Sequence, residues 1–138
     1  MPTQLDADEI IEFLAKVFPQ IHDGYTIERV GELEATVSLD PSHAHLRPGG
    51  TVSGPTMFTI ADLAFYVATL AMIGPEALTV TANATINFLR KPAPGKIIAE
   101  ARILKLGRSL SVGDVTIYSD GDDAPVAHAT MTYAIPQR

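Results

Sequence analysis

Residues 47–75 read RPGGTVSGPTMFTIADLAFYVATLAMIGP, a glycine-rich loop that leads into a long apolar segment. The one charged residue of that apolar segment is Asp62. Burying an unpaired carboxylate among apolar side chains is very costly, so such a group either has polar partners prepared for it or takes part in chemistry. The question of function is therefore largely the question of what Asp62 does.

The ends of this apolar segment carry strong helix signals. Ser53 or Gly54 provides the cap, and Pro55 fits the first turn because its missing amide hydrogen costs little there. Gly74–Pro75 provides the stop. Polar residues interrupt the segment, and it falls short of the roughly 20 apolar residues of a membrane span. We therefore predict a buried central helix and no membrane association.

Shorter elements precede this helix. Residues Asp6–Val17 place apolar side chains at spacings of three and four behind an acidic first turn, which predicts an amphipathic helix that ends before Pro19. Tyr25–Leu39 contains two β-rich pieces around Val30–Glu32, which predicts a hairpin with one buried face. Asp40–Gly50 is rich in turn residues and predicts an ordered loop.

After the central helix the hydrophobic period changes from about 3.6 to 2. In Leu78–Phe88 every second residue is apolar, beginning with the first, so we predict a strand with one apolar face. Ile97–Lys105 and Val126–Ile135 predict further strands. Between these, the apolar residues of Leu110–Ile117 change phase near Gly113, which favours a β-bulge there.

The expected order is a helix, a hairpin, a long apolar helix and a meander of about four strands, whose short connections favour antiparallel pairing. A long helix with so little polar surface needs apolar cover on most sides. A curved antiparallel sheet wrapped around it is the simplest solution, which gives an α+β architecture. The 138 residues fit a single domain, 1–138.

Composition excludes several classes of function. The net charge of -6 without a basic run argues against nucleic-acid binding, which needs a concentrated Lys/Arg surface. The absence of cysteine removes disulfides, cysteine zinc sites and thiol catalysis, and a polar, acidic amino terminus argues against export, so we expect a cytoplasmic protein. His43 and His45 lack acidic or cysteine partners, and His22 and His128 stand alone, so we expect no metal.

The polar residues of the central helix share one side of it. Thr59, Asp62, Tyr66 and Thr69 fall three, four and three residues apart, which places them in a single stripe. This stripe either faces a wet groove or a partner subunit, or it serves catalysis. The loop Gly49–Gly54 favours catalysis, because its amides near the positive end of the helix can hold a polarised carbonyl. A carboxylate beside such a carbonyl suits acyl transfer.

Two stretches carry a family resemblance: GTVSGPTMFTIADLAFYVATLA, residues 50–71, and TINFLRKPAPGKIIAEARILKLGRSL, residues 85–110. Together they resemble the hotdog-fold acyl-coenzyme A thioesterases of the phenylacetate-degradation (PaaI) type, over roughly Asp40–Ile135. In that family the loop usually reads G-T-V-H-G-G, an aspartate follows nine residues after the histidine, and a dimer places each site between subunits. The resemblance implies a hotdog fold, an acyl-coenzyme A substrate, a homo-oligomer and no separate cofactor.

The resemblance also implies roles for individual residues. Asp62 matches the catalytic carboxylate and Gly54 the amide that polarises the thioester carbonyl. The hydroxyl that holds the attacking water falls on Thr81 of the second subunit, with Asn83 as its nearest substitute. The stretches that line the coenzyme A arm and its phosphates correspond to Phe88, Leu89, Arg90, Lys91, Lys105, Gly107, Arg108 and Ser109, where basic groups and backbone amides suit phosphate.

Three positions depart from the family pattern. Ser53 replaces the loop histidine, Pro55 replaces the second glycine and removes its amide, and Arg47 stands where relatives carry Asn or Gln. Arg47 either pairs with Asp62, binds substrate or holds the loop together. Tyr66 forms either core or the wall of a substrate tunnel. We include Arg47, Ser53 and Tyr66 among the candidate substrate-binding residues.

The leading hypothesis is therefore hydrolysis of an acyl-coenzyme A thioester to coenzyme A and a free acid. The missing histidine and Pro55 support an alternative, a non-catalytic module that binds or senses acyl-coenzyme A. A third hypothesis is a hydratase or dehydratase on the same fold, which normally pairs a histidine with an acid; Ser53 removes that histidine. The acyl group, the choice between nucleophile and general base for Asp62, and the choice between dimer and tetramer stay open.

Overall fold

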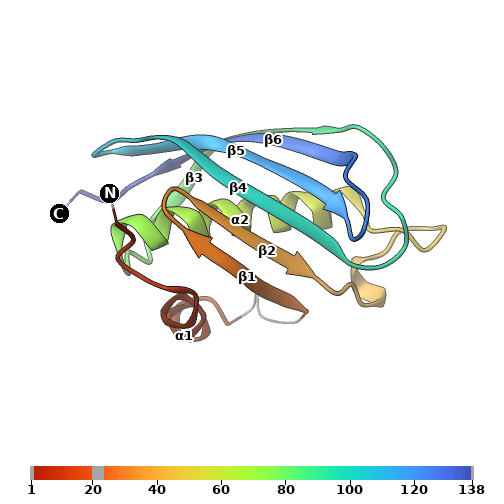
Figure 1. Cartoon of the computed structure of the whole chain (residues 1–138), viewed down its shortest axis with the longest axis horizontal. Coiled ribbons are helices and arrows are strands. Elements are labelled where there is room, and N and C mark those ends of the chain that lie inside the picture. Colours follow the sequence, from red (N-terminus) through yellow and green to blue (C-terminus); the bar gives the residue numbers. More distant parts are fainter. Residues whose placement is uncertain (1, 20–23, 138) are drawn as a thin grey trace.

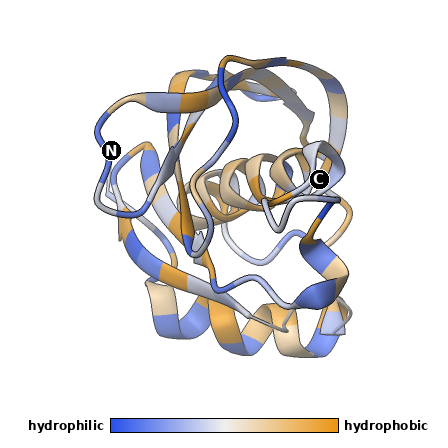
Figure 2. Ribbon diagram, turned by 90° about the vertical axis from the view of Figure 1, so that its right-hand side faces the viewer, coloured by the Kyte–Doolittle hydropathy of each residue, from blue (hydrophilic) through white to orange (hydrophobic). Residues whose placement is uncertain are grey.

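A long helix, α2 (Gly54–Ile73), runs through the middle of the protein, and an antiparallel sheet curves around it (Figure 1). This computed structural model describes residues 2–19 and 24–137, and within them the sheet has six strands. Figure 2 shows the helix enclosed by the strands, with apolar residues along it. The α+β arrangement predicted from the sequence is confirmed.

The elements follow the expected order. Their bounds are α1 (Ala7–Val17), β1 (Tyr25–Gly31), β2 (Glu34–Leu39), a 3-10 turn η2 (His43–His45), α2, β3 (Val80–Phe88), β4 (Ile97–Leu106), β5 (Leu110–Ser119) and β6 (Pro125–Ala134). A capping box between Asp6 and Glu9 starts α1, Ser53 caps α2, and Gly74 ends α2. The amino-terminal helix, the hairpin and both ends of the central helix therefore lie where local sequence signals placed them.

The order of strands in the sheet is β1-β2-β4-β5-β6-β3, and every neighbouring pair is antiparallel. The expected simple meander is wrong for β3, which pairs with β6 and not with β4. The reason lies in the connection 89–96, which does not turn back on β3. Its amides at Leu89 and Ala93 donate to Val126 O and Ser119 Oγ, so it crosses the ends of β6 and β5 before β4 begins. This leaves β3 at an edge of the sheet.

The bulge predicted at Gly113 is also wrong. Strand β5 alternates without interruption, and the extra residue lies opposite, at Leu104 of β4, where the register shifts between Ile103 and Lys105. Gly113 has a different role, because a Cβ atom built there would collide with the backbone oxygen of Arg102 and lie 2.8 Å from the ring of Phe65. The glycine allows β5, β4 and the central helix to approach closely.

We expect Gly113→Ala to lower the free energy of unfolding by about 1–3 kcal/mol, the usual cost of overpacking a core. Chemical denaturation monitored by circular dichroism measures this change. Gly107→Ala is the matched control, because its added Cβ atom meets its nearest neighbour, Leu110 O, at an ordinary 3.4 Å. Equal stability of the two variants would contradict the close approach at Gly113.

Strand β3 departs from the predicted alternation at its start. Its register with β6 shifts between Thr81 and Asn83, so Ala82 is the extra residue of a bulge. After the bulge Ala84 packs against the core as expected, but before it Val80 is 55% exposed. The predicted single apolar face is therefore wrong for the first part of the strand.

Helix α2 is long and apolar enough to cross a membrane, but 83% of its most apolar window is buried inside the protein. It is the core helix of this fold. Its cover comes from the inward residues of the sheet and from α1, whose Ile10 and Leu14 are buried.

Candidate functional site

The Asp62 carboxylate has partners prepared for it. Its Oδ1 atom accepts a hydrogen bond from Thr81 Oγ1 at 2.6 Å and another from the Tyr133 hydroxyl, also at 2.6 Å. The Tyr133 hydroxyl also lies 2.9 Å from the backbone oxygen of Asp62. Among the described residues no group donates to Oδ2. One carboxylate oxygen is thus fixed and the other is free.

The bulge in β3 explains how Thr81 reaches Asp62. A bulge re-aims the side chains that precede it, and here Thr79 and Thr81 turn toward the helix and away from the face that simple alternation gives them. The resemblance placed the Thr81 hydroxyl on a second subunit. The structure differs: Thr81 contacts Asp62 of its own chain. Asn83, the predicted substitute, lies beyond the bulge and is exposed.

Tyr133 was not predicted as a site residue. It comes from β6, directly opposite Thr81 in the β3–β6 register. Its ring stacks on Tyr66 at a centroid distance of 5.9 Å and tilts against Phe65 at 5.6 Å. Burial, and then the negative charge of Asp62, raise the pKa of Tyr133 far above its ordinary value. The hydroxyl therefore keeps its proton and acts as a donor.

A cavity of about 330 Å³ opens at Asp62. The carboxyl end of α1 forms one wall with Val17 and Phe18, and the Tyr66 ring forms another. The Tyr66 hydroxyl donates to Ala77 O at 3.1 Å. Thr79 also lines this cavity, and its buried Oγ1 atom has no hydrogen-bond partner among the described residues. The cavity therefore offers apolar and aromatic walls beside one carboxylate and a spare hydroxyl.

A second cavity, of about 430 Å³, lies at the amino terminus of α2. It brings Gly54, predicted to be catalytic, together with Arg47 and the stretch Phe88–Lys91, which were predicted to bind substrate. The Gly54 amide has no acceptor among the described residues and sits at the positive end of the helix. The cations of Arg47, Arg90 and Lys91 face the same space. This end of the protein is thus suited to an anion.

Ser53 does not share that role. Its hydroxyl accepts from the Thr56 amide at 3.3 Å and donates to Thr56 Oγ1 at 2.9 Å, which makes it the cap of the helix. It is not part of the cavity lining. Arg47 lines the cavity at Gly54 and forms no ion pair with Asp62 among the described residues. One of its three expected roles is therefore not realised within a single chain.

The expected polar stripe on α2 does not form one groove. Thr59 donates to the helix's own Pro55 O at 3.0 Å, and Thr69 is buried against Ser111, with 3.0 Å between the two hydroxyl oxygens. Asp62 and Tyr66 alone among the four stripe residues line the cavity.

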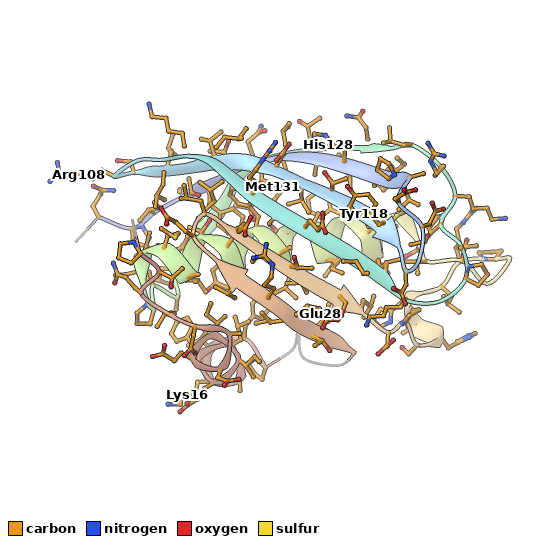
Figure 3. The ribbon with its side chains drawn as sticks, viewed as in Figure 1. Lys16, Glu28, Arg108, Tyr118, His128 and Met131 are labelled. Carbon is orange, nitrogen blue, oxygen red and sulfur yellow. The ribbon has the colours of Figure 1, made fainter. Side chains whose placement is uncertain are left out.

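Within one chain the predicted site residues fall into two groups, which lie at opposite ends of the sheet and of the first turns of α2. Asp62 follows Gly54 by eight residues, so the two lie about 12 Å apart along the helix axis. The turn Lys105–Ser109 joins β4 to β5 at the end of the sheet where β3 begins, because Leu110 pairs with Ala134, which pairs with the first residue of β3. Phe88–Lys91 lie at the other end. In Figure 3 Arg108 marks the extreme left of the molecule.

His45 and His128 have local partners. His45 Nδ1 accepts from the Ser42 amide at 2.9 Å, and the ring of His45 meets that of Tyr25 edge to face. His128 lies on the outer face of the sheet, with Nε2 3.0 Å from Asp114 Oδ2. His22 lies outside the described residues. None of these contacts points toward Asp62.

Residues 49–126 match the family model described as the thioesterase superfamily. A crystal structure of a "putative thioesterase" from Silicibacter sp. TM1040 is 49% identical, with a TM-score of 0.91, and covers 99% of this chain and 95% of its own. A mutant of the phenylacetic acid degradation protein PaaI from Thermus thermophilus is 26% identical, with a TM-score of 0.71 over 82% of this chain and 94% of its own.

A further solved structure, from Streptococcus mutans UA159, is a protein bound to acetyl-CoA. It is 23% identical, with a TM-score of 0.71, and the similarity covers 86% of this chain and 93% of that one. At that identity it shows likeness of fold.

Proposed function

Because this chain belongs to the thioesterase superfamily and has its hotdog fold, we propose that it hydrolyses an acyl-coenzyme A thioester to coenzyme A and a free acid. The observation that carries the proposal is the Asp62 carboxylate, which lines a cavity and has Oδ1 bound to two hydroxyls and Oδ2 without a donor among the described residues. A helix that is otherwise apolar retains this one charge where a substrate could reach it. A half-buried carboxylate on the wall of a cavity is typical of a functional site.

The divided site supports a homodimer in which each catalytic centre lies between two copies. Strand β3 has a free edge, and apolar side chains are exposed on and beside it: Leu78 is 77% exposed, Val80 55% and Phe88 52%. A free edge is a template for pairing with another strand. A second copy of this chain satisfies both the unpaired backbone and the apolar side chains.

A two-fold axis through the middle of β3 pairs this strand with its copy in antiparallel fashion. Within one chain the two ends of the nine-residue strand β3 lie about 26 Å apart. In the dimer the beginning of β3 in one copy lies beside the end of β3 in the other copy. Asp62, at the beginning, meets the Gly54 cavity of the second copy. The turn Lys105–Ser109 likewise approaches the other copy's Phe88–Lys91. The same two-fold axis therefore brings Asp62 to Gly54 and the turn Lys105–Ser109 to Phe88–Lys91, in each case from two different copies.

In this arrangement the Gly54 amide and the positive end of α2 polarise the thioester carbonyl. Asp62 either removes a proton from water or attacks the carbonyl carbon itself. The C–S bond then breaks, the coenzyme A sulfur leaves as a thiolate and takes up a proton, and water supplies the second oxygen of the acid. Arg47, Arg90, Lys91, Lys105 and Arg108 provide the cations that the coenzyme A phosphates require. The acetyl-CoA bound to the Streptococcus mutans protein of the same fold supports this substrate class.

Purified protein is expected to release free thiol from at least one member of a panel of aliphatic and aromatic acyl-coenzyme A esters, followed with a thiol-reactive dye. The loss of the family histidine, replaced by Ser53 as a helix cap, favours one rival, a module that only binds acyl-coenzyme A. Calorimetry with the same panel separates the two. Tight binding without turnover of any ester would establish the binding module and contradict hydrolysis.

A further inference from the structure

The two hydrogen-bond donors at Asp62 converge on a single oxygen. Thr81 reaches Oδ1 from the edge strand β3, and Tyr133 reaches the same atom from the neighbouring strand β6. Both distances are 2.6 Å, which is typical of a hydroxyl bound to a charged carboxylate. Among the described residues Oδ2 receives no hydrogen bond. The side chain therefore presents one defined free oxygen and cannot rotate without breaking both contacts.

Tyr133 itself is held firmly. It is 3% exposed, its ring contacts the rings of both Tyr66 and Phe65, and its hydroxyl also contacts the backbone oxygen of Asp62 at 2.9 Å. A donor that touches both the backbone and the side chain of one residue fixes that residue's rotamer relative to the helix. The ring packing explains why Tyr133 is buried, but it does not require a hydroxyl at this position.

The surroundings of Asp62 contain no cation among the described residues that line its cavity. Val17 and Phe18 come from the end of α1 and its cap, and Thr79–Thr81 come from the start of β3 and the residue before it; none of these ionises. The titratable neighbours are Tyr66 from α2, whose hydroxyl donates to Ala77 O, and Tyr133 from β6. The two hydroxyls on Oδ1 are thus the groups that stabilise the charged form of the carboxylate within one chain.

We propose that Tyr133 is a positioning residue that, together with Thr81, ties down Asp62 Oδ1 and leaves Oδ2 as the reacting oxygen. The proposal rests on the proposed thioesterase activity only for the identity of the reaction. It adds a residue that the loop and helix motifs do not reveal, and it assigns the two carboxylate oxygens different tasks. A water molecule or a thioester carbon approaches Oδ2, while Oδ1 stays bound.

Tyr133→Phe removes the hydroxyl and keeps the ring that packs on Tyr66 and Phe65. Loss of a hydrogen bond to a charged group commonly costs a factor of about 10–100, so we expect kcat to fall by that amount with KM changed less than about two-fold. A merely structural role for Tyr133 would change stability without this separation of kcat from KM.

Tyr118→Phe is the matched control, since it makes the same change on the outer face of the sheet (Figure 3). We expect its kcat and KM to equal those of the wild type. Thr81→Val provides a second test should Tyr133→Phe fail to fold, because it removes the other donor to Oδ1 and is expected to lower kcat in the same way. Wild-type kcat in both variants would overturn the proposal while the proposed function stands.

An NMR measurement that needs no substrate turnover tests the role of Tyr133 independently of the proposed function. NMR coupling constants of the Asp62 side chain, whose signals are identified by their absence in Asp62→Asn, report whether it holds a single rotamer. We expect one rotamer in the wild type and averaged rotamers in Tyr133→Phe, because a contact that fixes the side chain is lost. Unchanged couplings overturn the positioning role, even in a protein that hydrolyses no ester of the panel.

Discussion

Asp62→Asn is expected to lower kcat/KM for the best acyl-coenzyme A ester by about 10²–10⁴-fold, the usual contribution of a positioned carboxylate base. The amide oxygen of Asn still accepts from Thr81 and Tyr133, whose hydroxyls bind Oδ1 in the wild type at 2.6 Å. The variant therefore keeps the local hydrogen bonds and loses the charge. Thiol release at saturating and at low substrate concentration gives kcat and kcat/KM separately.

Asp114→Asn is the control for this substitution. Asp114 is a carboxylate on the outer face of the sheet, where it contacts His128 and Arg102, and it has no contact with the Asp62 cavity. We expect wild-type activity from it. Thermal melting shows whether each variant folds. Full activity of a folded Asp62→Asn variant would remove Asp62 from the reaction and with it the proposed mechanism.

The departures from the family loop have a simple physical meaning in this structure. Pro55 occupies the first turn of α2, where no helical acceptor awaits its missing amide hydrogen. Ser53 takes over the capping of the Thr56 amide. The amide that stays without a partner among the described residues at this helix start is that of Gly54. With Ser53 and Pro55 in place of the family residues, the Gly54 amide is therefore the donor at this helix start that can bind the substrate carbonyl.

Local sequence signals predicted a large part of the fold. The caps at Ser53 and Gly74 and the apolar run between them located α2, and the alternation of Ile97–Lys105 located β4. The prominence of Asp62 was visible for the same reason, since a charge inside an apolar helix stands out without any knowledge of its neighbours. These are properties of short segments, which periodicity and capping report directly.

What the sequence could not show depends on contacts between distant segments. Alternation along β3 does not reveal that its partner is β6, and so it could not place Tyr133 opposite Thr81. The bulge at Ala82 left no glycine as a signal, whereas Gly113 suggested a bulge but serves close packing. Because a one-residue shift exchanges the faces of a strand, that missed bulge reversed the expected orientation of Thr81.

The separation of Gly54 from Asp62 leads to the second large prediction. A helix of fixed rise holds them about 12 Å apart, so one thioester cannot contact both groups of the same chain. A heterodimer that carries Asp62→Asn on one chain and Gly54→Pro on the other then has one site with both defects and one site with neither. Isolated by two different affinity tags, it is expected to show about half of the wild-type turnover per dimer.

Each parent homodimer is expected to be inactive, because every site then carries a defect. Gly54→Pro removes the amide hydrogen at a first-turn position that accepts proline, and Gly54→Ala is its control, since it keeps the amide and its added Cβ atom lies 3.4 Å from the Phe88 ring. A heterodimer of wild type with Asp62→Asn also retains one intact site and about half of the turnover. If that heterodimer is active while the Asp62→Asn/Gly54→Pro pair is dead, each chain supplies its own complete site, and the pairing of two copies along β3 does not build the catalytic centre.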